Sequence, residues 1–213
     1  VYEPSPLNRI EKQYGPGSHW HDATEGKGSI NTAYLSNNSN QYPCIEYKVT
    51  GTRSNPQLDK RADNDGLYTA GELYVTEVKD EEGNTSYEFK DKLGQVVLTR
   101  QLNETTDNGT RTQETLDTYY VYDDFGNLCF VLPPKTAEIT DADSLALYAY
   151  QYKYDNHNRP TAKKIPGADW VKYVYDKADR LIFNQDGEQR AKSDNATQQE
   201  WLLTINDALG RVA

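Results

Sequence analysis

Two histidines, His19 and His21, flank Trp20, so on a β-strand both imidazoles would project from the same face. Paired imidazoles are typical zinc ligands, but a zinc site needs a third or fourth ligand. The remaining histidine, His157, falls in a predicted turn. We therefore expect surface or edge-strand histidines here, with no metal and no other cofactor.

A loop rich in carboxylates is a second candidate metal site. Asp59, Asp63 and Asp65 precede Gly66, and calcium-binding loops space their oxygen ligands in a similar way. The full EF-hand pattern with its terminal glutamate is not met. A solvated turn is the favoured interpretation, and calcium is the alternative.

The residues offer little for catalysis. Among 33 acidic residues some pair can always be proposed for glycoside hydrolysis, so such a pair carries no information. Neither a Gly-x-Ser-x-Gly elbow nor a convincing Cys-His arrangement occurs. Whether Cys44 and Cys129 pair is left open, with two buried free thiols favoured over a disulfide. We predict that the chain is not an enzyme.

The composition favours a thin, aromatic core. An apolar fraction of 36% and a net charge of −10 would suit a disordered chain, but 17 of the residues are tyrosine, which buries a large ring and favours strands. The sequence has no Lys/Arg cluster for nucleic acid and no apolar run of about 20 residues for membrane insertion. Because the chain begins at Val1 in mid-pattern and lacks methionine, we expect a piece of a longer protein.

From residue 119 onward one pattern recurs: aromatic, any, aromatic, Asp, two of any kind, a turn residue, a polar or basic residue, then an apolar one. Its clear copies are Tyr120-x-Tyr122-Asp123 with Gly126, Tyr152-x-Tyr154-Asp155 with Asn158 and Arg159, and Tyr173-x-Tyr175-Asp176 with Asp179 and Arg180. Two outlying copies are worn, namely Asp91 to Gly94 and Asp207 to Gly210 followed by Arg211.

Each copy predicts a β-hairpin. The alternating aromatics form the incoming strand, with both rings on one face. The Asp carboxylate begins a turn by accepting hydrogen bonds from backbone N–H groups about two residues ahead. The third residue after the Asp needs a positive φ, and Gly, Asn and Asp are the types that adopt it most readily. These features predict a type I turn followed by a bulge, and then the outgoing strand.

Longer intervals between copies should carry inserts. Two of them suggest a short helix, one within Thr140 to Tyr148 with Thr140 or Asp141 as its cap, and one within Ser193 to Trp201. The insert Asn103 to Thr115 contains a further turn signal.

The part before the repeats is less regular. Residues 1–72 form an irregular, β-rich lead-in in which Tyr42 to Thr50 is a predicted strand and Ser54 to Gly66 a polar loop. Residues 73–213 hold the degenerate hairpins, beginning with one around Asp80 to Asn84. No linker is evident, so we expect one continuous all-β body: successive antiparallel hairpins in a curved, partly open sheet or shell segment, with one or two short helices.

On these motifs the chain resembles the Rhs/YD-repeat family, with a Bacteroidetes-like lead-in at Ser5 to Arg9 and Trp20. The resemblance implies a segment of a large secreted or cell-surface protein whose hairpins form a hollow shell, in several members around a C-terminal toxin domain. The family's self-cleaving protease element finds no match here, so no catalytic residue carries over. Implied partners are neighbouring repeats and an enclosed C-terminal domain.

The tyrosine surplus has two interpretations. In a scaffold the rings form ladders, each row packing on the row of the next repeat. In an adhesion module the rings stay exposed and stack on cell-surface glycans or protein. We favour the ladder, because it explains the register of the repeats, and keep a carbohydrate- or protein-binding module as the alternative.

Overall fold

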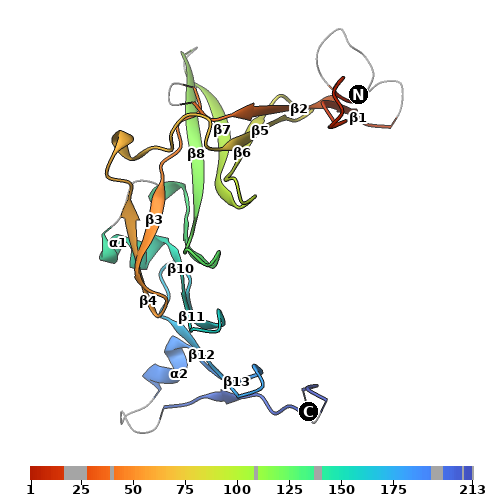
Figure 1. Ribbon diagram of the computed structural model, residues 1–213. Helices are drawn as coiled ribbons and strands as arrows, with labels where there is room; N and C mark the ends of the chain where they lie inside the picture. The colour runs from red at the N-terminus through yellow and green to blue at the C-terminus, as the bar shows by residue number, and fades with distance from the viewer. Residues whose placement is uncertain are drawn as a thin grey trace. The chain divides into compact units, whose positions relative to one another are not determined.

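The computed structural model describes residues 1–16, 28–38, 41–107, 110–136, 141–192, 199–207 and 209–212 (Figure 1). The chain divides into two compact units. The first comprises Val1–Glu46 with Lys60–Tyr119, and the second Tyr47–Asp59 with Tyr120–Ala213. The units interleave along the sequence and do not follow the division between residues 72 and 73. That the chain is one continuous body stays a prediction.

The first unit is an antiparallel sheet in the order β1-β2-β5-β6-β7-β8. Its strands are β1 (Lys12–Tyr14), β2 (Ser29–Ser36), β5 (Tyr74–Lys79), β6 (Thr85–Lys90), β7 (Val96–Asp107) and β8 (Thr110–Tyr122), and a 3₁₀ turn, η2, spans Asn64–Gly66. The last three residues of β8 belong to the second unit. From β5 onward, each strand follows its sequence neighbour, as consecutive hairpins require.

One cross-strand row forms the centre of this unit. Val75 lies opposite Phe89, Phe89 opposite Leu98, and Leu98 opposite Tyr119. These side chains are between 0% and 3% exposed. Residues directly opposite each other on one face of a sheet make the closest side-chain contacts, so this row binds four strands together.

The second unit continues the hairpins in the order β9-β10-β11-β12-β13-β14, with β3 and β4 as a separate two-stranded sheet. The bounds are β3 (Tyr47–Thr52), β4 (Asn55–Lys60), β9 (Leu128–Leu132), β10 (Tyr150–Tyr154), β11 (Pro160–Lys164), β12 (Val171–Tyr175), β13 (Leu181–Gln185) and β14 (Leu202–Leu203), with η3 (Pro134–Thr136) and the helices α1 (Ala142–Tyr148) and α2 (Gly187–Ala191). Cys129, Phe130, Leu132 and Ala149 are its most buried apolar residues, each between 0% and 2% exposed.

The predicted all-β class is confirmed: successive strands pair antiparallel, the sheet is not closed, and the described helices are two and short. Helix α1 lies where the second insert predicted one, and the Asp141 carboxylate caps it by accepting from Ser144 N at 2.9 Å. Helix α2 lies earlier than the helix expected within Ser193 to Trp201, of which residues 193–198 lie outside the described part.

One local expectation is wrong. Residues Asn55–Lys60 form strand β4, where the sequence suggested a polar loop. Gly51, near the end of β3, has a φ of 84°, and a tight turn then returns the chain, with Thr52 Oγ1 accepting from Asn55 N at 3.2 Å. Pro56 is tolerated because a two-stranded sheet consists of edge strands.

No helix in the described ranges is long and apolar enough to cross a membrane.

Candidate functional site

The repeated turn is the most regular feature of the chain. In every copy the Asp carboxylate accepts hydrogen bonds from the backbone N–H groups two and four residues ahead. The six aspartates that do so are Asp80, Asp91, Asp123, Asp155, Asp176 and Asp207, with N···O distances of 2.8–3.0 Å. The predicted role of this aspartate is therefore confirmed.

The third residue after each Asp has a positive φ, as predicted. The values are 94° at Gly83, 83° at Gly94, 80° at Gly126, 59° at Asn158, 61° at Asp179 and 79° at Gly210. Strand register shifts by one residue just before the turn at Phe89/Lys90, Lys153/Tyr154 and Val174/Tyr175, which is the predicted bulge. The Asp80 turn was expected as a hairpin, but its membership in the repeat was missed because the aromatic pair does not precede it.

The fourth residue after the Asp also has a defined role, which the sequence pattern described only as polar or basic. In five of the six turns its side chain donates to the second carboxylate oxygen of the same Asp. The donors are Asn84, Asn127, Arg159, Arg180 and Arg211, at 2.7–2.9 Å. The carboxylate is thus held by both backbone and side-chain donors, and the turn closes on a charge-assisted bond where the donor is arginine.

At Asp80, Asp155, Asp176 and Asp207 these bonds lower the pKa of the carboxyl group because they favour its ionised form. Backbone and side-chain bonds from Arg180 lower the pKa of Asp176, and those from Arg211 lower that of Asp207. Burial acts against ionisation of Asp155, but the hydrogen bonds from Arg159 outweigh it and the pKa is lowered.

The second tyrosine of a repeat reaches back to the preceding repeat. Tyr154 Oη donates to the carbonyl of Leu128 at 2.8 Å, and Tyr175 Oη donates to the carbonyl of Pro160 at 2.9 Å. Both acceptors are the fifth residue after the turn aspartate of the previous copy. Burial raises the pKa of Tyr154 to about 12, so its hydroxyl stays a donor at neutral pH.

The arginine of a repeat reaches forward to the next. Arg159 Nη1 donates to the carbonyl of Asp176 at 3.4 Å and to Asp179 Oδ1 at 2.6 Å, and its guanidinium lies 4.9 Å from the ring centroid of Tyr175. Arg180 Nη1 repeats the first contact with the carbonyl of Asp207 at 3.4 Å. We call the backward tyrosine bond and the forward arginine bond together the repeat latch.

The predicted site residues thus come together in part. The latch includes Tyr154, Tyr175, Asp176, Asp179, Arg159, Arg180 and Asp207. Asp155 binds Arg159 within its own turn, and Asn158 accepts from Asn127 Nδ2 at 3.2 Å. The remaining tyrosines, Tyr120, Tyr122, Tyr152 and Tyr173, are half-buried in β8, β10 and β12. Rings stacked in a ladder stay a prediction, since what joins these repeats is a hydroxyl-to-carbonyl bond.

The candidate chemical groups do not assemble. Within the described ranges no group of three or more His, Cys, Asp and Glu side chains could hold a metal. Asp63 is paired with Arg61 at 2.6 Å, and His19, Trp20 and His21 lie outside the described residues. Cys44 and Cys129 are both buried free thiols, and burial raises the pKa of Cys129 to about 12.

Fold and turns define a class: an open antiparallel β-protein built from hairpin repeats joined by side-chain to backbone bonds. No known protein-family model and no curated protein matches the sequence. A solved structure that is similar is "Crystal Structure of TcdB2-TccC3", at 12% identity and a TM-score of 0.38, over 74% of this chain and 11% of that one. The chain therefore spans about a ninth of that protein's length.

Proposed function

We propose that this chain is a structural scaffold: a wall segment of a larger secreted or cell-surface protein of the Rhs/YD-repeat kind. Its partners are the neighbouring repeats of the same protein, and an enclosed C-terminal domain such as a toxin. The observation that carries this proposal is the repeat latch. In two successive repeats the second tyrosine and the arginine hold one hairpin to the next, through backbone carbonyls of the adjoining repeats.

An adhesion module would need those same side chains free to meet a ligand. Here the Tyr154 and Tyr175 hydroxyls and the Arg159 guanidinium are already engaged between repeats. The motif residues therefore stabilise the contacts between neighbouring repeats, as in repeat proteins, where each unit contacts only its neighbours.

The test is whether damage to one repeat loosens the next. Arg159→Ala removes the forward contact to the 176–180 turn, and Lys163→Ala removes the same charge from an exposed position in β11. Hydrogen exchange by mass spectrometry should show faster exchange in residues 176–180 for Arg159→Ala, in addition to its own turn, and unchanged exchange there for Lys163→Ala. Exchange that rises only in residues 155–159 would refute the scaffold, because the turns would then be independent.

A further inference from the structure

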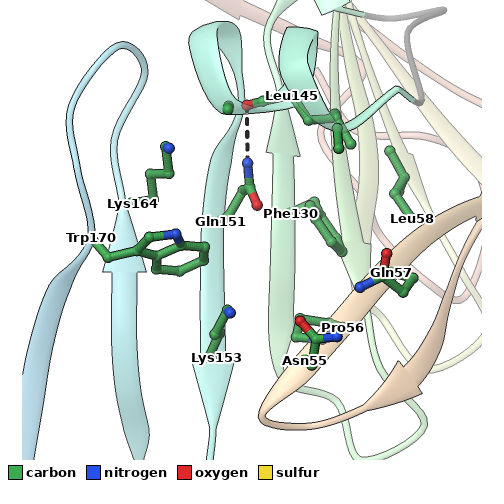
Figure 2. Close-up of a pocket in the computed structure, with 12 residues that line it drawn as sticks. Asn55, Pro56, Gln57, Leu58, Phe130, Leu145, Gln151, Lys153, Lys164 and Trp170 are labelled. Atoms are coloured by element: carbon green, nitrogen blue, oxygen red, sulfur yellow. Dashed lines mark hydrogen bonds between the residues drawn. The ribbon is translucent and has the colours of Figure 1, made fainter.

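A groove in the second unit is not used by the repeat latch. It has a volume of about 260 Å³ and is bounded by β4, β9, β10, β11, helix α1 and the loop before β12. Figure 2 shows Trp170, Lys153 and Lys164 on one side of it, Asn55 and Gln57 from β4 on the other, and Phe130 between them.

Strand pairing puts three of these side chains in one row. Phe130 lies opposite Gln151, and Gln151 lies opposite Lys164. Lys153 is two residues from Gln151 in β10 and so projects from the same face. Gln151 Nε2 donates to the carbonyl of Leu145 at 3.0 Å, which fixes α1 against this row (Figure 2). The groove is therefore built on paired strands and held in place before any ligand arrives.

The charge of the groove is opposite to that of the chain. The sequence carries a net charge of −10, yet no carboxylate lines the groove, and two ammonium groups do. Across the ranges that the structure describes, neither Lys153 nor Lys164 makes an ion pair. The nearby Asp169 carboxylate is bound to Arg190 at 2.8 Å. Two unpaired cations in one concave site favour an anionic ligand.

The other lining groups limit what that anion can be. The Lys153 ammonium lies 4.5 Å from the centroid of the Trp170 ring, so the cation and an aromatic surface are presented together. The side-chain amides of Asn55 and Gln57 make no hydrogen bond within the described part of the chain, and each can both donate and accept. The site thus offers cations, an aromatic ring and free amides within one small volume.

We propose that this groove binds a carboxylated sugar residue of an acidic glycan. The ammonium groups of Lys153 and Lys164 pair with the sugar carboxylate, the ring of Trp170 packs against its C–H face, and the amides of Asn55 and Gln57 bond its hydroxyls. The volume of about 260 Å³ lies just below the usual range of ligand pockets, roughly 300–1,000 Å³, and suits one ring rather than a long ligand.

An acidic peptide fits less well. Extended peptides bind most readily by adding to a free strand edge, but β10 is paired on both sides, with β9 and with β11. Strand β4 does have a free edge, but Pro56 has no N–H to donate along it. A peptide would leave its backbone groups without partners here, whereas a sugar uses the amides that the groove offers. The glycan site and the scaffold role are independent, since they use different residues.

The test is calorimetric titration of the full chain with trigalacturonate, maltotriose and hexaglutamate. We expect trigalacturonate to bind, and the double variant Lys153→Gln/Lys164→Gln to weaken it at least about tenfold, because each charged hydrogen bond contributes on that order. Lys163→Gln/Lys172→Gln, which removes two exposed lysines outside the groove, should bind like the unmodified chain. Asn55→Ala should weaken trigalacturonate binding without changing the unfolding midpoint.

Each other outcome overturns the proposal. Absence of trigalacturonate binding refutes the site. Equal binding of maltotriose refutes the requirement for a carboxylate, and equal or tighter binding of hexaglutamate assigns the groove to acidic peptide. Equal losses in the two double lysine variants would mean that binding follows overall charge and not this groove. Thermal unfolding of every variant shows whether it is folded before its affinity is interpreted.

Discussion

The hydroxyl of Tyr154 donates to the backbone carbonyl of Leu128 at 2.8 Å, so that a side chain of one repeat is bonded to the main chain of the repeat before it. Tyr154→Phe removes this donor and keeps the ring. We expect a loss of about 1 kcal/mol in the free energy of unfolding, the usual size for one hydrogen bond at a part-buried position. Urea unfolding followed by tyrosine and tryptophan fluorescence measures it.

Tyr150→Phe is the matched control for this variant. Tyr150 lies in the same strand, is 37% exposed, and its hydroxyl makes no hydrogen bond in the described part of the chain. Its removal should change the free energy of unfolding by less than about 0.5 kcal/mol. Equal losses in the two variants would show that the Leu128 bond contributes nothing of its own.

A second prediction concerns the residue with a positive φ in the turn, three positions after the Asp. Gly94 has a φ of 83°, and a Cβ added there would meet nothing within 4 Å, so backbone conformation alone decides the effect of substitution. Gly94→Val should lower the free energy of unfolding by about 1–2 kcal/mol, because β-branched residues resist a positive φ. Gly94→Asn should cost clearly less, since Asn occupies the same position at Asn158 with a φ of 59°. Comparable losses for Val and Asn in thermal unfolding would contradict this account of the turn.

The turn aspartates predict acid sensitivity. Bonds from Arg180 and from Arg211 lower the folded-state pKa of Asp176 and Asp207. A carboxyl whose pKa is lower in the folded state stabilises the protein above its unfolded pKa, about 3.9, and this stabilisation is lost as pH falls through the folded pKa. We therefore expect the urea concentration at the unfolding midpoint to decrease once the pH is lowered below about 4, in a series measured from pH 7 to pH 2.

The matched variants separate these carboxylates from the general effect of acid. Asp176→Asn/Asp207→Asn should have a lower midpoint at pH 7 and a shallower fall below about pH 4 than the unmodified chain. Asp124→Asn removes an exposed carboxylate with no hydrogen bond in the described residues, and should leave the profile unchanged. A profile of the same steepness in the double variant would rule out Asp176 and Asp207 as the source.

The turns could be predicted from the sequence because their backbone requirements depend only on a few adjacent residues. A positive φ three residues after Asp123 or Asp176 restricts the residue type strongly, and that restriction can be read from one position. Helix α1 could be predicted for the same reason, because its Asp141 cap is also a local signal. Contacts between residues that are distant in the sequence could not be predicted. The pattern gives Arg159 a place in the motif, but its bond to Asp179 arises only when the next hairpin pairs alongside.

The groove and strand β4 were missed for a related reason. Asn55 and Pro56 are typical of loops, and only pairing with β3 makes a strand of them. The groove needs that strand, the insert helix α1 and three strands of the main sheet at once, and no short stretch of sequence contains such a combination. Trp170 and Lys153 had no spacing that marked them as neighbours.

A buried ion pair in the first unit supports the last prediction. Arg100 and Asp117 are opposite each other in β7 and β8, with Nε–Oδ1 at 2.7 Å and Nη2–Oδ2 at 2.6 Å, and their side chains are 11% and 12% exposed. Arg100 Nη2 also donates to the carbonyl of Pro43 at 3.0 Å, which attaches the lead-in to the sheet. Arg100→Met leaves the Asp117 carboxylate in a dry site without its cation, and we expect a loss of about 3–5 kcal/mol in the free energy of unfolding.

Two further variants show whether the cost comes from the orphaned charge. Arg100→Met/Asp117→Leu removes both charges, so it should recover much of the loss, because an apolar pair of similar size avoids the desolvation penalty. Lys90→Met breaks the pair with Glu88, whose side chains are 42% and 41% exposed, and should cost at most about 1 kcal/mol. Urea unfolding of the unmodified chain and the three variants measures and ranks their free energies of unfolding. If the double variant is no more stable than Arg100→Met, the loss comes from the missing Pro43 contact and not from the unpaired Asp117 carboxylate.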